Sequence, residues 1–263
     1  MNRNAIGMFD SGVGGLTVMK EVITELPEED IIYLGDTKRF PYGSKSKETI
    51  IKCTKQAIDF LLTKNVKAIV IACGTATSQA LDEVKQIYNI PIIGIIEPTI
   101  NYINDKDNIR SVGVIATAGT INSKSWEKNL FKMNPNLEVI SKACPLLAPM
   151  AEEGWTENEI AKLTIKEYLK ELHKVDSLIL GCTHYPLFTK AIEEEMDKDV
   201  DIINTGKVVS KYLKRFLTEK SLLSTNSKGN YDIYLTDLDC NFEKVAKEFL
   251  NLPIELKKAD ILN

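Results

Sequence analysis

The chain has 263 residues, of which 44% are hydrophobic and 27% charged, and its formal net charge at pH 7 is −4. This is an ordinary globular composition, and the length suits one large domain or two of half that size. The net negative charge disfavours duplex nucleic acid and anionic membranes as partners, so a small-molecule ligand is the better hypothesis. No apolar run reaches the roughly 18 residues of a spanning helix, and the N-terminus lacks a signal peptide, so we expect a cytoplasmic protein.

Short runs of β-branched and aliphatic residues recur along the chain, as is typical of strands buried on both faces. They predict strands at residues 5–9, 31–34, 68–72, 92–96, 112–116, 177–180, 200–203 and 232–235. Apolar residues at helical spacing predict amphipathic helices over 49–64 and around 160–172. The polar stretch 221–230 predicts a surface loop between the last helix and the final strand. Strands that alternate with helices indicate an α/β fold with parallel sheets.

Ligands of parallel α/β folds bind at the carboxyl ends of the strands, so we expect the functional residues in the loops that follow the expected strands. Four of these loops are rich in glycine and hydroxylated residues: 10–15 (DSGVGG), 73–78 (CGTATS), 117–120 (TAGT) and 181–186 (GCTHYP). Such loops expose backbone N–H groups at the start of a helix, which is an arrangement that binds anions.

The loops also belong to a weak internal repeat. The strand around Gly7 resembles the strand around Gly113, and the strand that ends at Cys73 resembles the strand that ends at Cys182. The number of residues between the two members is nearly the same in both pairs. A repeat of this length indicates duplication of a domain rather than a solenoid. If the two halves face each other, the loops meet in one cleft, with a cysteine arriving from each side.

The five cysteines form no CxxC pair, and a chain of this length needs no disulfide staples, so disulfides and a zinc finger are both disfavoured. Cys53, Cys144 and Cys240 are interpreted as small buried hydrophobes. Cys73 and Cys182 stand apart because their strand-end setting is repeated.

Two equivalent thiols suit a reaction whose substrate and product are mirror images. Inverting the α-carbon of an amino acid requires removal of a proton from one face and delivery of a proton to the other, which two cysteines can share. Their pKa, normally about 8.5, must fall for a thiolate to form, and helix N-termini or nearby cations lower it. Hydroxyl donors would bind the substrate carboxylates, and the candidates are Thr75, Thr117, Thr120 and Thr183.

Six blocks of the sequence resemble the glutamate racemases, a family of the cofactor-independent aspartate/glutamate racemase superfamily. These blocks are residues 7–18 (GMFDSGVGGLTV), 33–43 (YLGDTKRFPYG), 72–81 (ACGTATSQAL), 113–121 (GVIATAGTI), 151–155 (AEEGW) and 180–187 (LGCTHYPL). The resemblance implies two similar α/β domains related by a pseudo-twofold axis, with the active site in the cleft between them. We accordingly expect a first domain of residues 1–97 and 208–263 and a second of residues 98–207.

The same resemblance implies the activity, which is interconversion of L- and D-glutamate with no cofactor and no metal. The D-glutamate would enter bacterial peptidoglycan. Glutamate is then the small-molecule partner, with no nucleic acid or membrane involved, and the family's habit of pairing leads us to expect a homodimer.

Site residues are carried over position by position. Cys73 and Cys182 match the two catalytic bases, and Asp10, Asp36, Glu152 and His184 match polar residues that assist proton transfer or tune the thiols. Contacts with the substrate are expected from Asp10, Ser11, Pro41, Tyr42, Gly43, Gly74, Thr75, Thr117, Thr120, Thr183 and His184. One position departs from the pattern: many members have Asn, whose side chain could bind the substrate, where this chain has Gly74.

Three other functions remain open from the residues alone. The same chemistry could act on aspartate, the cleft could bind an anion without catalysis, or one cysteine could be the nucleophile of a hydrolase. Loop 10–15 could also cradle a phosphate, but it lacks the lysine of a Walker A loop and the spacing of a dinucleotide site.

Overall fold

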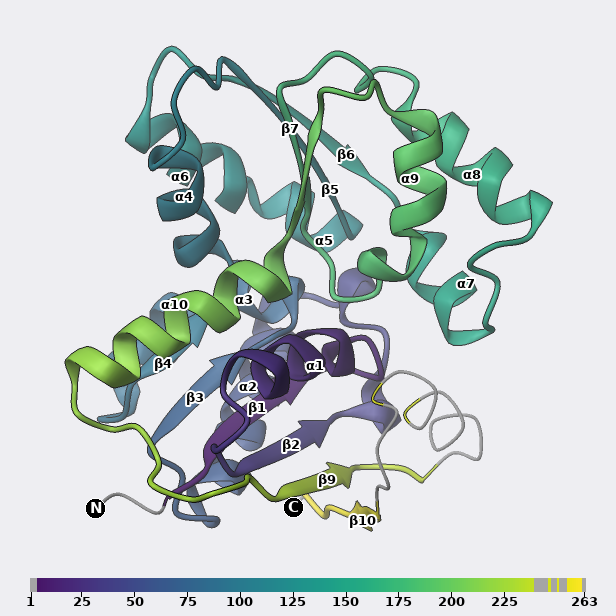
Figure 1. Ribbon diagram of the computed structural model, residues 1–263. Helices are drawn as coiled ribbons and strands as arrows, with labels where there is room; N and C mark the ends of the chain where they lie inside the picture. The colour runs from purple at the N-terminus through teal and green to yellow at the C-terminus, as the bar shows by residue number, and fades with distance from the viewer. Residues whose placement is uncertain (1–3, 239–245, 247–249, 251–254, 262–263) are drawn as a thin grey trace.

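The computed structural model describes residues 4–238, 246, 250 and 255–261, and it contains two parallel β-sheets stacked one above the other in Figure 1. The six-stranded sheet has the order β10 (Leu256–Lys258), β9 (Tyr231–Leu235), β2 (Ile31–Gly35), β1 (Ile6–Asp10), β3 (Ala68–Ile71), β4 (Ile92–Gly94). The four-stranded sheet has the order β6 (Glu138–Ala143), β5 (Ser111–Ala116), β7 (Ser177–Leu180), β8 (Asp201–Asn204).

The two sheets repeat one strand order. In the first half the order is β2-β1-β3-β4, and in the second it is β6-β5-β7-β8. Numbered along the chain within each half, the strands therefore have the same order in both sheets: second, first, third, fourth. Strands β9 and β10 extend the first sheet beside β2. The predicted internal repeat and the predicted fold class are confirmed. In each half the chain reverses its direction of winding between the first and third strands, which is where α/β folds bind ligands.

Helices flank both sheets. In the first half these are α1 (Gly15–Glu25), α2 (Lys47–Leu62), α3 (Gly74–Ile87) and the short 3-10 turns η1 (Thr37–Arg39) and η2 (Tyr42–Ser44). In the second half they are α5 (Ala118–Ser123), α6 (Ser125–Met133), α7 (Leu147–Glu152), α8 (Glu159–Leu169), η3 (Tyr185–Phe188) and α9 (Thr189–Glu195). The two expected helices correspond to α2 and α8, whose N-caps are the side chains of Ser46 and Asn158.

The eight expected strands are all present, with bounds that differ by one or two residues. The central strands β1, β3 and β7 are buried along their whole length, which is why their apolar runs are continuous. Strands β6 and β10 were missed. Both lie at sheet edges and carry only partly buried or exposed residues, so neither has an apolar run. Because β10 follows β9, the expectation that residues 232–235 form the final strand was wrong.

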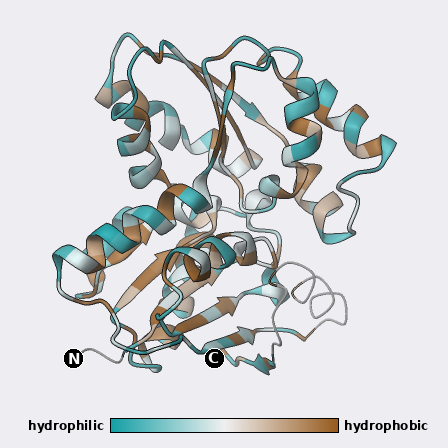
Figure 2. Ribbon diagram, in the orientation of Figure 1, coloured by the Kyte–Doolittle hydropathy of each residue, from teal (hydrophilic) through white to brown (hydrophobic). Residues whose placement is uncertain are grey.

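Two helices connect the sheets. Helix α4 (Ile96–Asn104) leads from β4 to β5, and α10 (Thr205–Glu219) leads from β8 back to β9. They pack on each other, and α10 also packs along α1. Their apolar faces share one core cluster with residues of both sheets, and in Figure 2 both helices show mixed brown and teal segments. The exact domain boundaries stay a prediction.

No helix among the described residues is long and apolar enough to cross a membrane. Cys53 and Cys144 are buried, as expected, whereas Cys240 lies outside the described residues.

A buried ion pair fastens the loop that follows α10 to the first sheet. The ammonium group of Lys67 pairs with the Glu29 carboxylate, and both side chains are at most 2% exposed. The same two groups hold the loop backbone: Lys67 Nζ donates to Leu222 O at 2.7 Å, and Ser224 N donates to Glu29 Oε1 at 2.7 Å. The predicted loop over 221–230 is therefore tied down at its start.

Substitution of Lys67 tests how much this anchor stabilises the fold. Lys67→Met leaves the Glu29 carboxylate buried without its cation, so we expect the free energy of unfolding to fall by about 3 kcal/mol. Lys85→Met is the matched control, because Lys85 and Glu97 form an ion pair with side chains 41% and 57% exposed. We expect that control to lose less than about 1 kcal/mol. Unfolding in urea measures both free energies. Equal losses of the free energy of unfolding in the two variants would contradict the role of the buried pair as an anchor.

Candidate active site

A cavity lined by both halves lies where the carboxyl ends of the two sheets meet. Its walls come from the loops after β1, β2 and β3 of the first half and after β5, β6 and β7 of the second. The lining residues are Ser11, Phe40, Pro41, Tyr42, Gly43, Ser44, Cys73, Gly74, Thr75, Thr117, Ala118, Pro145, Ala148, Pro149, Cys182, Thr183 and His184. Corresponding strands of the two halves thus contribute to one site, and each half supplies one thiol.

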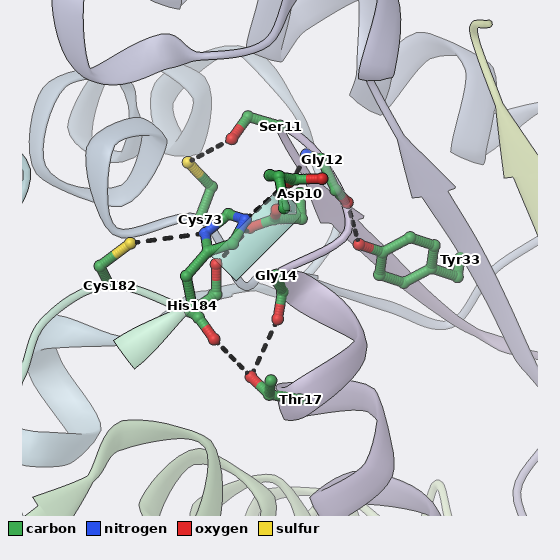
Figure 3. A network of polar contacts seen from close by, with 11 residues as sticks. Asp10, Ser11, Gly12, Gly14, Thr17, Tyr33, Cys73, Cys182 and His184 are labelled. Atoms are coloured by element: carbon green, nitrogen blue, oxygen red, sulfur yellow. Dashed lines mark hydrogen bonds and ion pairs between the residues drawn. The ribbon is translucent and has the colours of Figure 1, made fainter. Parts of the chain in front are cut away.

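Cys73 begins helix α3 directly after β3. Its sulfur accepts a hydrogen bond from Ala76 N at 3.5 Å. It donates one to Ser11 Oγ at 3.6 Å (Figure 3). Burial, with the nearby Asp10 carboxylate, nevertheless raises the pKa of Cys73 to about 12. The Ala76 N–H at the start of the helix acts to lower this pKa, as expected, but burial and the Asp10 charge outweigh it, so the expected net fall in pKa does not occur at Cys73. Cys73 is a thiol at neutral pH.

Cys182 has a different neighbourhood. Its sulfur lies 3.7 Å from His184 Nδ1 (Figure 3), and His184 Nε2 lies 2.7 Å from Glu152 Oε1. Burial would lower the pKa of His184, but the hydrogen bonds and negative charges of Cys182 and Glu152 raise it to about 10. His184 is therefore an imidazolium at neutral pH, so a cation lies beside the Cys182 sulfur.

Asp10 lies behind the cavity wall rather than in it. The carboxylate is fully buried, accepts a hydrogen bond from Gly12 N at 2.9 Å and one from Thr183 Oγ1 at 3.3 Å. Burial raises its pKa to about 6, against the lowering effect of the His184 charge. Asp10 therefore links the two halves and is close enough to act electrically on both Cys73 and His184.

Three of the four predicted threonine donors line the cavity. Thr75 Oγ1 and Thr117 Oγ1 lie 2.9 Å apart across the boundary between the halves, and Thr183 enters from the loop after β7. Thr120 is fully buried behind them, with its hydroxyl 3.0 Å from Thr117 Oγ1. Thr120 can orient Thr117 but does not face the cavity.

Asp36 and Glu152 are not cavity-lining residues either. Asp36 accepts a hydrogen bond from the Tyr42 hydroxyl and forms a 2.6 Å ion pair with Arg39 Nε, so it holds the loop that carries Tyr42. Glu152 forms a hydrogen bond with His184 Nε2 and so fixes the orientation of the imidazole ring. Both carboxylates support residues that line the cavity.

Gly74 is a point of close approach between the halves. A Cβ built on Gly74 would lie 2.2 Å from the carbonyl oxygen of Gly181, the residue before Cys182. An Asn here, which the resemblance led us to expect, would require the two cysteine loops to move apart at this point. In this chain the backbone of Gly74 lines the cavity in its place.

Six lining residues were missed by sequence reasoning: Phe40, Ser44, Ala118, Pro145, Ala148 and Pro149. Three of them follow β6, so failure to recognise that strand concealed its loop. The signal was present in the neighbouring block 151–155, which begins shortly after that loop. The other three adjoin residues that were predicted. Among the described residues, no group of three or more His, Cys, Asp or Glu side chains is arranged to hold a metal ion.

Comparisons with known proteins agree with this geometry. A family model described as Asp/Glu/Hydantoin racemase matches residues 6–213. The glutamate racemase of Geobacter metallireducens is 43% identical over 249 residues, which cover 94% of this chain and 92% of that protein.

Solved structures give the same result. A glutamate racemase from Bacillus anthracis has a TM-score of 0.95 at 36% identity, covering 99% of this chain and 98% of that one. The glutamate racemase of Francisella tularensis, in complex with D-glutamate, has a TM-score of 0.93 at 41% identity, covering 100% and 99%. The chain therefore belongs to the Asp/Glu/hydantoin racemase family.

Proposed function

We propose that this protein interconverts L- and D-glutamate by two-base proton transfer at Cα between Cys73 and Cys182. The observation that carries the proposal is that one cavity is lined by both thiols, each from a corresponding loop of a different half. The relatives named as glutamate racemases support glutamate as the substrate. The bound D-glutamate of the Francisella tularensis enzyme supports it further.

In each direction one sulfur acts as the base and the other as the acid. In one direction Cys182, beside the His184 imidazolium, removes the proton from Cα, and the Cys73 thiol delivers its own proton to the opposite face. The product leaves with Cys182 as thiol and Cys73 as thiolate, so one proton has entered the enzyme and one has left it. The opposite enantiomer reacts with the roles exchanged.

The Cα proton is weakly acidic, so the site must accommodate the charge that develops on the substrate carboxylate. The hydroxyls of Thr75 and Thr117 and the backbone of Gly74 line the cavity and are suitable donors, whereas the Thr183 hydroxyl donates to Asp10. Because the fold already places these groups, through the 2.9 Å contact between Thr75 and Thr117, little reorganisation is needed as the charge appears.

The resemblance to peptidoglycan-linked family members supports a role in supplying D-glutamate for the bacterial cell wall. In that role we expect the protein to work in the cytoplasm.

Serine substitutions test the two-base mechanism. Cys73→Ser and Cys182→Ser each replace an acid–base thiol with a much weaker acid, so we expect kcat for glutamate racemisation to fall by roughly 10²–10⁴-fold. Circular dichroism in the far ultraviolet should stay unchanged, and racemisation is followed by optical activity. Cys53→Ala is the control, because Cys53 is buried in the core and lines no part of the cavity. If either serine variant keeps near-normal kcat, the two-base assignment is wrong.

The pH profile tests the role assigned to His184. Glu152 raises the pKa of His184, which is about 10 in the native protein, so Glu152→Gln should lower that pKa. The imidazolium is then lost at a lower pH, and the alkaline fall in activity should shift toward neutrality. The substrate amine titrates in the same way with the wild type and with Glu152→Gln, so it does not contribute to the difference between their pH profiles. Glu153→Gln, at an exposed neighbouring position, should leave the profile unchanged. Coincident profiles for all three proteins would refute the role.

A further inference from the structure

A second hollow adjoins the catalytic cavity, and the proposed chemistry does not use it. We call it the lysine groove, and its lining residues are Gly43, Ser44, Lys45, Lys47, Ser78, Gln79, Asp82, Ala118, Gly119, Asn122, Ser123, Ser125, Lys128 and Asn129. It runs between the η2–α2 and α3 segments of the first half and α5 and α6 of the second. Gly43, Ser44 and Ala118 line both the groove and the catalytic cavity, so the two spaces share a wall.

The charged side chains that line the lysine groove are mostly positive, whereas the protein as a whole has a net negative charge. Its charged lining residues are Lys45, Lys47, Lys128 and a single carboxylate, Asp82, whereas the net charge of the chain is −4. None of the three ammonium groups forms an ion pair with a residue that the structure describes, and Lys128 has only a 3.5 Å contact to Ser123 O. An amino-dicarboxylate carries two carboxylates and one ammonium, so three lysines and one aspartate complement it.

The shared wall includes contacts between the two halves. A Cβ on Gly119 would lie 2.8 Å from Gly43 O, so these two backbones touch. Gln79 Nε2 donates to Gly119 O at 3.0 Å, and on the cavity side Thr75 and Thr117 share their 2.9 Å hydrogen bond. A small separation of the halves at these contacts would join the groove to the cavity.

The catalytic cavity has another exposed rim, which carries no such charge. Pro41, Pro145 and Pro149 line the cavity and are exposed. A charged amino acid loses hydration against an apolar rim without gaining an ionic partner, whereas the lysine groove offers ionic and amide partners throughout.

We propose that the lysine groove is an encounter site that captures the anionic amino-dicarboxylate and passes it to the catalytic cavity through the Gly43–Gly119 contact. The proposal rests on the proposed glutamate activity. Local positive charge overcomes the repulsion that a net negative protein exerts on an anionic substrate, and it raises the rate of productive encounter. Lys45, Lys47 and Lys128 are then capture residues, which act before the chemical step.

The test neutralises the groove and measures kcat and KM separately. The variant K45Q/K47Q/K128Q should lose about 3- to 10-fold in kcat/KM for both glutamate enantiomers at low ionic strength, with kcat near the wild-type value. Added sodium chloride should lower kcat/KM of the wild type toward that of the variant, because salt screens exposed charges. K166Q/K198Q/K220Q is the matched control, since it removes the same charge from exposed lysines outside the groove. This control should behave as the wild type.

Three results would overturn the proposal. The groove variant and the control could show the same kcat/KM and the same salt dependence, or the groove variant could lose kcat instead of kcat/KM. Either result, with an active wild type, refutes capture by the lysine groove and leaves the racemase assignment intact. A wild-type protein that racemises no glutamate would instead refute the proposed function, and the encounter site with it.

Discussion

The structure depends on one constraint: two loops from different sheets must bring their sulfurs to the same void. Parallel sheets satisfy it because every strand ends at the same edge, and two sheets of equal strand order can set those edges face to face. Contacts between the halves then close the space, among them Gly74 against Gly181 and Thr183 against Asp10. The cavity is accordingly a product of the repeat, since neither half could enclose it alone.

The repeat places the two thiols at equivalent positions in the two halves, but their neighbouring charges differ. Cys73 lies in a dry setting near the Asp10 carboxylate, which raises its pKa, whereas Cys182 adjoins an imidazolium held by Glu152. The two thiols therefore differ in their electrostatic surroundings before substrate binds. The proposed two-base reaction requires one sulfur to act as base while the other acts as acid, with the roles exchanged for the opposite enantiomer.

Much of this could be predicted from sequence, for physical reasons. Buried central strands such as β1 and β7 leave continuous apolar runs, and the repeated strand-end cysteines identify both thiols. Edge strand β6 leaves no such run, so the loop with Pro145 and its neighbours was missed. Protonation states were beyond sequence reasoning, because burial and distant charges decide them. The groove around Lys128 was also hidden, since it joins segments from both halves.

Early-turnover labelling in heavy water tests the central claim most directly. Each enantiomer of glutamate is incubated separately with the protein, and substrate and product are resolved and analysed for deuterium at Cα. If opposed thiols act on the two faces, newly formed product carries solvent deuterium while recovered substrate stays protiated, from either direction. A single base serving both faces would place label in recovered substrate as readily as in product, or return the original hydrogen to the product, and either pattern would contradict the account.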